Sequence, residues 1–238
     1  IYTLSLHDAL PISSYHEFNK IDKAKILVED LKSGKNIALV TDAGTPGISD
    51  PGEELVRFCL EAGIEVTSLP GPAACITALT MSGLSTRRFC FEGFLPMDKK
   101  EREVVLERLQ RETRTTIFYE APHRLLKTLK VLQETAGNRR LTICKELTKR
   151  HEKTWPTCLE EAIECYETNE PRGEYVLVLE GADAKALKEE DQAAWESLSI
   201  EEHMGIYLSK GQTKKEAMKS VASDRGMTKR EVYQYLLH

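Results

Sequence analysis

A twelve-residue segment rich in glycine and proline, Thr41–Gly52, constrains the fold of this chain more than any other. It follows a short apolar run, Asn36–Val40, and precedes an amphipathic stretch, Glu53–Glu61. A strand, a glycine-rich loop and a helix in this order place a ligand at the carboxyl end of a sheet in α/β proteins. A plain connection needs only about 2–6 residues. The segment therefore predicts a rigid ligand-binding loop, and the alternative is an ordinary well-structured turn.

Apolar runs alternate with helical patterns from Ser13 to Gly181, which indicates an α/β fold. We predict two α/β domains, residues 13–86 and 87–182, followed by a small helical domain over residues 183–238. The expected strands are Ile37–Val40, Ile64–Leu69, Phe89–Leu95, Thr115–Tyr119, Leu141–Glu146 and Glu174–Leu179. The expected helices are Ile21–Ser33, Glu53–Ala62, Ala73–Met81, Lys99–Arg111, Leu125–Ala136 and Cys158–Thr168.

The carboxy-terminal region has the pattern of short, capped helices. Three Ser/Thr-x-x-Glu capping boxes begin at Ser199, Thr213 and Thr228, and the last two helices resemble a helix-turn-helix. From residue 210 to residue 230 there are seven basic side chains against two acidic ones. This excess predicts binding to RNA, and the alternative is a solvated face on a small helical bundle. The basic residues are Lys210, Lys214, Lys215, Lys219, Arg225, Lys229 and Arg230.

Composition narrows the class of protein. The net charge of −5 gives no overall attraction to nucleic acid, so any such binding must rest on a local basic surface. The six cysteines contain no C-x-x-C pair, which favours free thiols in a reducing cytoplasm. The histidines and cysteines have no metal-ligand spacing, so we expect no metal. No apolar run reaches the roughly 18 residues that span a bilayer, so we expect no membrane contact.

The amino-terminal segment Ile1–Ile12 has a different origin from the rest in our interpretation. Its sequence, IYTLSLHDALPI, is that of a translated short-read sequencing adapter, and it has neither a basic start nor a continuous apolar core typical of a targeting signal. We expect the biological sequence to start at about Ser13 and leave residues 1–12 out of the fold prediction.

Other chemistry-bearing residues follow further predicted strands. A second loop, Gly71–Ala73, lies at a strand end, and polar segments begin at Tyr119 and Lys145. Carboxylates and bases at several strand ends are typical of a ligand cleft between α/β domains. The first loop is neither a P-loop nor a G-x-G-x-x-G motif, so a ligand with a ribose and little phosphate fits it better. The small residues after Gly71 are also explained by packing against the sheet.

Six motifs occur in order between Thr41 and Gly181: TDAGTPGISDPG, LPGPAACITAL, FEGFLP, FYEAPHRLLKTL, KELTK and RGEYVLVLEG. Together they resemble the tetrapyrrole methylase superfamily and, within it, the ribosomal RNA small subunit methyltransferase I family. The resemblance implies two α/β domains with S-adenosylmethionine between them. It also implies methylation of the 2′-hydroxyl of a cytidine in 16S ribosomal RNA of the small subunit, by a cytoplasmic homodimer.

The resemblance assigns roles to residues of this chain. The implied cofactor-binding residues are Asp42, Ala43, Gly44, Thr45, Pro46, Gly47, Asp50, Gly71, Pro72, Ala73 and Tyr119. The candidate catalytic residues, any of which could accept the hydroxyl proton, are Glu120, His123, Lys145 and Glu146. Arg124 joins the basic carboxy-terminal residues as a candidate RNA ligand.

Departures from the family pattern leave other functions open. The family begins with a strand and a G-T-P-I-G-N turn followed by E-D-T-R, which are absent here, so the first domain is expected to be incomplete. Pro156-Thr157 also replaces an expected Arg-Gly. The alternatives are a precorrin-type tetrapyrrole methyltransferase and a non-catalytic RNA-binding fragment. The basic helical tail argues against the first, because a small substrate needs no nucleic-acid platform.

Overall fold

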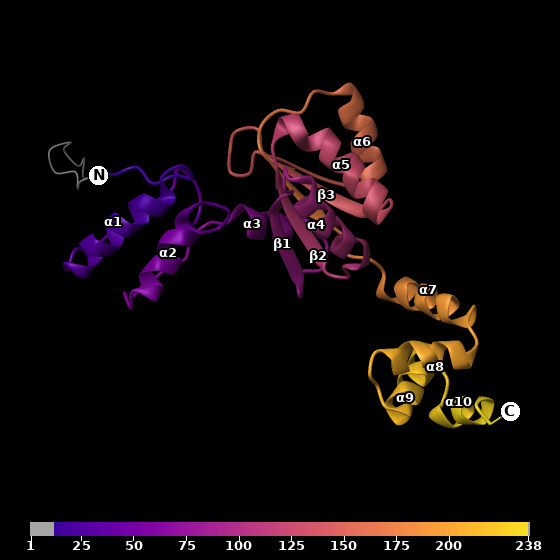
Figure 1. Ribbon diagram of the computed structural model, residues 1–238. Helices are drawn as coiled ribbons and strands as arrows, with labels where there is room; N and C mark the ends of the chain where they lie inside the picture. Colours follow the sequence, from indigo (N-terminus) through magenta and orange to yellow (C-terminus); the bar gives the residue numbers. More distant parts are fainter. Residues whose placement is uncertain (1–11, 238) are drawn as a thin grey trace.

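Ten helices and five strands make up residues 12–237, the part of the chain that this computed structural model describes (Figure 1). Apart from Ile12, the segment Ile1–Ile12 lies outside the described residues, so its interpretation stays a prediction. The strands are β1 (Phe89–Phe94), β2 (Thr115–Glu120), β3 (Arg140–Lys145), β4 (Lys153–Cys158) and β5 (Tyr175–Leu179). The helices are α1 (Lys20–Lys32), α2 (Gly52–Glu61), α3 (Ala74–Met81), α4 (Lys99–Arg111), α5 (Pro122–Ala136), α6 (Leu159–Thr168), α7 (Ala184–Glu196), α8 (Ile200–Ser209), α9 (Lys214–Asp224) and α10 (Lys229–Tyr235).

The five strands form one sheet in the order β1-β2-β5-β3-β4. Strands β1 and β2 are parallel, and β5 runs antiparallel to both β2 and β3, so β1, β2 and β3 all point the same way. Their carboxyl ends and the amino ends of β4 and β5 form one edge of the sheet, which we call the carboxyl edge. Across this edge Glu120 pairs with Tyr175, and Lys145 pairs with both Tyr175 and Lys153.

The two faces of the sheet are covered by different helices (Figure 1). Because side chains alternate along a strand, Phe118 of β2 and Leu177 of β5 face α4, α5 and α6, in the larger core. Their neighbours Ile117 and Val178 face α3 on the other side. Each fully buried leucine-sized side chain contributes about 1.5–3 kcal/mol to stability. The larger core therefore fixes α5 and α6, whose first turns lie near opposite edges of the sheet.

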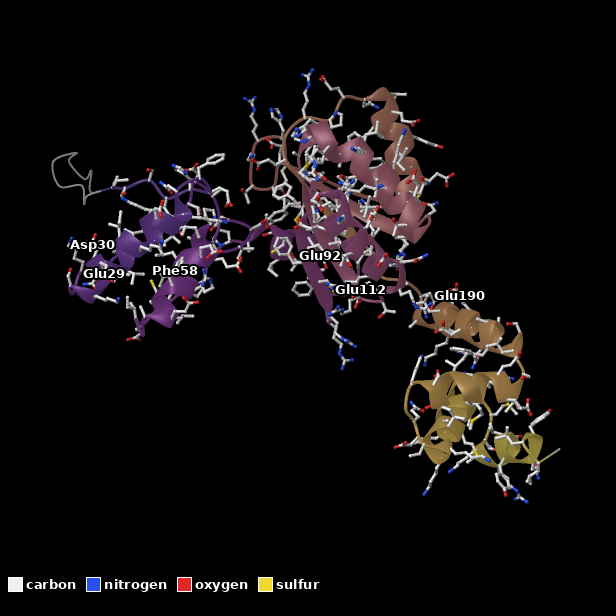
Figure 2. The ribbon with its side chains drawn as sticks, viewed as in Figure 1. Glu29, Asp30, Phe58, Glu92, Glu112 and Glu190 are labelled. Carbon is white, nitrogen blue, oxygen red and sulfur yellow. The ribbon has the colours of Figure 1, made fainter. Side chains whose placement is uncertain are left out.

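Helices α1 and α2 pack on each other and lie apart from the sheet (Figure 1). Ala24 and Val28 of α1 contact Leu55 and Cys59 of α2 in a small core of their own. Phe58, labelled on α2 in Figure 2, is partly buried against this core. The loop after α2 leads to α3, which shares its core with the sheet.

The prediction of two strands ahead of β1 in the sequence is wrong. Neither Ile37–Val40 nor Ile64–Leu69 is a strand, and the exposed fraction reaches 79% at Val40 and 82% at Leu69. Their apolar residues give the propensity for a strand, but backbone N–H and C=O groups form a sheet only beside a paired neighbour. Neither segment pairs with another strand in the part of the chain that is described.

The remaining predictions of secondary structure hold with small shifts at the ends, and the α/β class is confirmed. Strand β4 was not predicted, because Pro156 interrupts its apolar pattern. A proline is accepted there because β4 is an edge strand that pairs only with β3. The division of the chain at residue 86 stays a prediction, and α3, on its amino-terminal side, packs against the sheet.

Helices α7–α10 follow β5 and lie beyond the edge of the sheet opposite the carboxyl edge (Figure 1). All three predicted capping boxes are confirmed, at Ser199, Thr213 and Thr228. A third core, which includes Met204, Val221 and Val232, holds α8, α9 and α10 together.

We predict that Gly181→Ala destabilises the protein. A Cβ atom at Gly181 would lie 2.2 Å from the carbonyl oxygen of Thr113. The neighbouring residues Ala182 and Glu112 are joined by a hydrogen bond from the Ala182 amide to the Glu112 carbonyl. Figure 2 shows Glu112 near the beginning of α7. Overpacking of this kind costs about 1–3 kcal/mol, measurable by urea unfolding. The matched control is Gly205→Ala inside α8, where a Cβ meets open space and the free energy of unfolding should rise by about 0.5–1 kcal/mol. Equal effects of the two substitutions would contradict this account.

Candidate active site

The loop Thr41–Gly52 is held in shape by one of its two aspartates. The Asp50 carboxylate accepts hydrogen bonds from the amides of Gly47, at 3.0 and 2.9 Å, and of Gly52, at 2.7 Å. Gly44 and Gly47 have φ values of +82° and +83°, which favour glycine. Asp50 is thus occupied within the loop. Asp42 is exposed, and its carboxylate forms no hydrogen bond or ion pair with any residue that the structure describes.

The two predicted cofactor loops lie against each other. Thr45 donates to the carbonyl oxygen of Pro72 from its amide at 2.9 Å and from its hydroxyl at 3.1 Å. A Cβ atom on Gly71 would lie 2.9 Å from the Thr45 hydroxyl, so a side chain there would push this hydroxyl away from its position. The structure therefore brings Asp42–Gly47 and Gly71–Ala73 together into one surface.

The first loop and the beginning of α3, directly after the second loop, lie against the sheet at the carboxyl ends of β1 and β2. The Tyr119 hydroxyl accepts a hydrogen bond of 3.1 Å from the amide of Cys75, at the beginning of α3. Burial raises the pKa of Tyr119 to about 12, so the hydroxyl is neutral at physiological pH. Ser49 of the first loop lies beside Gly93, where a shift in the pairing of β1 and a φ of +62° mark a bulge. Tyr119 thus lies where the two loops meet the carboxyl edge.

Glu120 lies next to Tyr119 in sequence but points to the opposite face of the sheet. Its side chain is fully buried and accepts hydrogen bonds from the amide of Ala121, at 2.8 Å, and from the hydroxyl of Thr128. The Arg124 guanidinium lies 3.5 Å from the same carboxylate and donates to the carbonyl of Leu95 at 2.6 Å. Glu120 and Arg124 therefore connect β2, α5 and the end of β1, and both are already occupied.

The other three candidate catalytic residues lie along the carboxyl edge. His123 is exposed in the first turn of α5, and Lys145 is half-buried, its ammonium 5.9 Å from the centre of the Tyr175 ring. Glu146 accepts from the amide of Glu174 at 2.8 Å and pairs with Lys149 at 3.1 Å. These two contacts, the backbone hydrogen bond first, lower the pKa of Glu146 and make it a weaker base.

The basic residues predicted to bind RNA divide into two groups. Arg225 is occupied: one guanidinium nitrogen donates to the carbonyls of Trp195, Leu198 and Ser199 at 2.7, 2.6 and 3.0 Å. An open cavity of about 570 Å³ lies between α8 and α9. Lys210 and Lys219 line this cavity. The exposed group, on α9, α10 and the turn after α8, consists of Lys210, Lys214, Lys215, Lys219, Lys229 and Arg230.

A buried histidine joins the helices of the carboxy-terminal region. The ring of His203 stacks on Trp195 with ring centres 4.1 Å apart. Its Nε2 lies 3.2 Å from the Asp224 carboxylate, and its Nδ1 accepts from Arg225 at 3.2 Å. Tyr207 donates its hydroxyl to the same carboxylate. Burial first, and then the charge of Arg225, lower the pKa of His203, so the ring stays neutral.

Sequence reasoning missed the contact between Ser49 and Gly93. A glycine inside a predicted strand indicates a bulge or a close backbone approach, so FEGFLP contained the signal.

Within residues 12–237 no three His, Cys, Asp or Glu side chains are placed to hold a metal ion. No described helix is long and apolar enough to cross a membrane.

The sheet, the two glycine loops and their contact at the carboxyl edge define an α/β protein with a candidate ligand site at that edge. The family described as Tetrapyrrole (Corrin/Porphyrin) Methylases matches residues 6–163. Among solved structures, the methyltransferase CobJ shares the fold with a TM-score of 0.54 at 21% identity, covering 68% of this chain and 72% of CobJ. A uroporphyrin III C-methyl transferase from Thermus thermophilus has a TM-score of 0.51 at 20% identity, with 69% and 73% covered.

Curated relatives define the family more narrowly. Ribosomal RNA small subunit methyltransferase I of Bacillus subtilis is 47% identical over 223 residues, which is 94% of this chain and 76% of the relative. The protein of the same name from Synechocystis is 45% identical, covering 95% of this chain and 80% of the relative. The chain belongs to the ribosomal RNA small subunit methyltransferase I family, a family of S-adenosylmethionine-dependent enzymes.

We predict that acid destabilises the carboxy-terminal helices through His203. Its pKa in the folded protein lies below the ordinary value of 6.5, so the unfolded chain binds more protons between these two values. The contribution of the neutral His203 to the free energy of unfolding is therefore fully present above pH 6.5. It is lost as the pH drops through the pKa of His203 in the folded protein. Urea unfolding at pH 7.5 and 5.5, followed by Trp195 fluorescence in a Trp155→Phe background, measures this. His203→Gln keeps a donor and an acceptor but does not titrate, and it should weaken the pH dependence. An unchanged dependence would contradict the assignment.

Proposed function

We propose that this chain transfers the methyl group of S-adenosylmethionine to the 2′-hydroxyl of a cytidine in 16S ribosomal RNA of the small subunit. The observation that carries the proposal is the contact of the two glycine loops with each other, beside the hydrogen bond between Tyr119 at the carboxyl edge and Cys75, which follows the second loop. Open α/β sheets bind their ligands outside the carboxyl ends of the strands. The names of the relatives, which are at 41–49% identity, supply the ribosomal RNA substrate.

The residues at the loops fit the cofactor. Asp42 presents an exposed carboxylate with no intramolecular partner among the described residues, which suits a ribose hydroxyl. Gly44 and Gly71 allow the two loops to approach closely, and Pro46 and Pro72 make them rigid. S-adenosylmethionine supplies a methyl group that is already activated on a sulfonium. The protein then contributes alignment, which in well-oriented cases is worth about 7–11 kcal/mol.

The ribose hydroxyl must also lose its proton, and we propose His123 as the acceptor. An imidazole can accept a proton at neutral pH, and His123 is exposed at the carboxyl edge. Glu120 is buried and bonded on the opposite face, so we propose it as a positioning residue that fixes the first turn of α5. Glu146 is held by the Glu174 amide and Lys149, and Lys145 is the second candidate acceptor.

We propose that the exposed lysines of α9 and α10 bind the RNA through its phosphates. Phosphate contacts position a protein on nucleic acid, and regular RNA helices hide the identity of their bases. The target cytidine would therefore come from a loop or a single-stranded segment. A porphyrinoid substrate is the second candidate, but it gives no purpose to six exposed cations on the carboxy-terminal helices.

We propose a cytoplasmic homodimer, as the family resemblance implies. Several large apolar side chains are exposed on the loops around α2 and after β1, among them Val40, Leu69 and Met97. Exposed apolar patches mark interaction surfaces. Light scattering of the purified protein should give twice the chain mass of 26.9 kDa. Leu69→Glu should shift the measured mass toward that of a single chain. A wild-type mass of one chain would contradict the dimer.

We predict that the chain incorporates the labelled methyl group of S-adenosylmethionine into 16S RNA of purified 30S subunits. Mapping of the product should place the methyl group on one cytidine ribose. A precorrin substrate offered in parallel should remain unmodified. Methylation of the precorrin, or of a base in place of a ribose, would contradict the proposed function.

Two substitutions separate the proposed roles in the same assay. Asp42→Asn should weaken S-adenosylmethionine binding in calorimetry. His123→Ala should leave that binding unchanged and lower kcat by roughly 10²-fold or more, the usual contribution of a general base. The control is Lys127→Ala, an exposed change one turn further along α5.

A further inference from the structure

The segment Glu146–Glu152, which connects β3 and β4 and which we call the β3–β4 loop, is a second charged surface at the carboxyl edge. From Lys145 to Lys153 the chain has four basic and two acidic side chains, in a protein whose net charge is −5. The loop begins where β3 ends, on the same edge as Tyr119 and His123. Its cations therefore lie at the end of the sheet that carries the proposed transfer site.

The β3–β4 loop is rigid although it is exposed. Glu146 and Thr148 have φ values of +50° and +64°, which residues other than glycine rarely adopt. The Glu146 carboxylate accepts from the Glu174 amide, and a Cβ on Gly173, whose φ is +85°, would lie 2.7 Å from that carboxylate, so glycine is favoured there. At the other end of the loop, the Glu152 carboxylate accepts from the Thr148 amide. The backbone is thus fixed by the two acidic residues of the loop.

The same contacts decide which cations remain free. Lys149 is neutralised by Glu146 at 3.1 Å and by Glu174 at 2.8 Å. Arg150 is exposed and forms no ion pair with any described residue. Lys145 and Lys153 face each other across β3 and β4, and neither has a carboxylate partner in the described part of the chain. Like charges directly opposite on a sheet repel, and an anion between them relieves the repulsion.

We propose that the β3–β4 loop holds the RNA backbone beside the transfer site, with Arg150 and the pair Lys145–Lys153 each facing a phosphate. The inference rests on the proposed function, because it takes RNA as the substrate. A guanidinium matches a phosphate with two parallel hydrogen bonds, and a rigid loop loses little entropy when it binds. The loop thereby sets which nucleotide reaches the site, whereas the carboxy-terminal lysines hold the RNA at a distance from it.

Binding of purified 30S subunits at a series of KCl concentrations tests the proposal. Each phosphate contact contributes about 0.7–0.9 to the slope of log Kd against log salt. Arg150→Ala and Lys153→Ala should each lower this slope by the amount that one phosphate contact contributes. Each should also raise Kd by roughly tenfold, the effect of one charge-assisted hydrogen bond. Arg150→Lys keeps the charge and should keep the slope. The matched control is Arg88→Ala, which removes an exposed arginine that forms no ion pair with any described residue. Arg88 directly precedes β1 and therefore lies at the edge of the sheet opposite the carboxyl edge.

The outcomes separate this inference from the proposed function. Wild-type chain that methylates 30S subunits while Arg150→Ala keeps the wild-type slope and Kd overturns the inference alone. A raised Kd with an unchanged slope also overturns it, because it indicates contact with ribosomal protein and not with phosphate. Wild-type chain that binds 30S subunits without methylating them overturns the proposed function, and the slopes of the variants still decide the inference. Binding of S-adenosylmethionine should be equal in all four variants.

Discussion

The ion pair between the buried Glu120 and the partly buried Arg124 is the interaction on which the architecture of the site depends. Glu120 ends β2, Arg124 lies in the first turn of α5, and the arginine also donates to the carbonyl of Leu95 after β1. A fully buried carboxylate left without its partner costs about 3–5 kcal/mol. These contacts therefore fix where two parallel strands end and how α5 begins. His123, one residue before Arg124, takes its place at the carboxyl edge from the same contacts.

The alternation of side chains along β2 assigns the two faces of the sheet to different tasks. Tyr119 points toward α3 and accepts a hydrogen bond from the Cys75 amide at its beginning, whereas Glu120 points toward α5 and the larger core. One face thus receives the loops, and the other is filled by α4, α5 and α6. The antiparallel β5 between β2 and β3 leaves β1, β2 and β3 parallel. Consequently the side chains that follow each of them gather at one edge.

Much of this arrangement could be predicted from the sequence, where local patterns decide the structure. The capping boxes of α8, α9 and α10 depend on residues three positions apart, and all three are confirmed. The segment Ile37–Val40 shows the opposite case, since its propensity for a strand is not met by a pairing partner. The burial of Glu120, and the use of Arg124 and Arg225 as ligands of backbone carbonyls, depend on contacts between distant elements. The sequence shows that such residues are charged, but it does not show that their hydrogen-bonding groups already have partners inside the protein.

The distribution of free cations supports the proposal that this acidic protein binds RNA at a defined point. Arg124 and Arg225 donate to carbonyls inside the protein, and Lys149 is neutralised by two carboxylates. Two groups of the exposed cations belong to the proposed RNA-binding surfaces, one on α9 and α10 and one on the rigid loop after β3. Helices α7–α10 leave from the edge of the sheet opposite the carboxyl edge (Figure 1). In the proposed function, contacts at both places would constrain the RNA across the length of the strands. Phosphate contacts fix register without reading bases, so two such points would determine which nucleotide lies at the carboxyl edge.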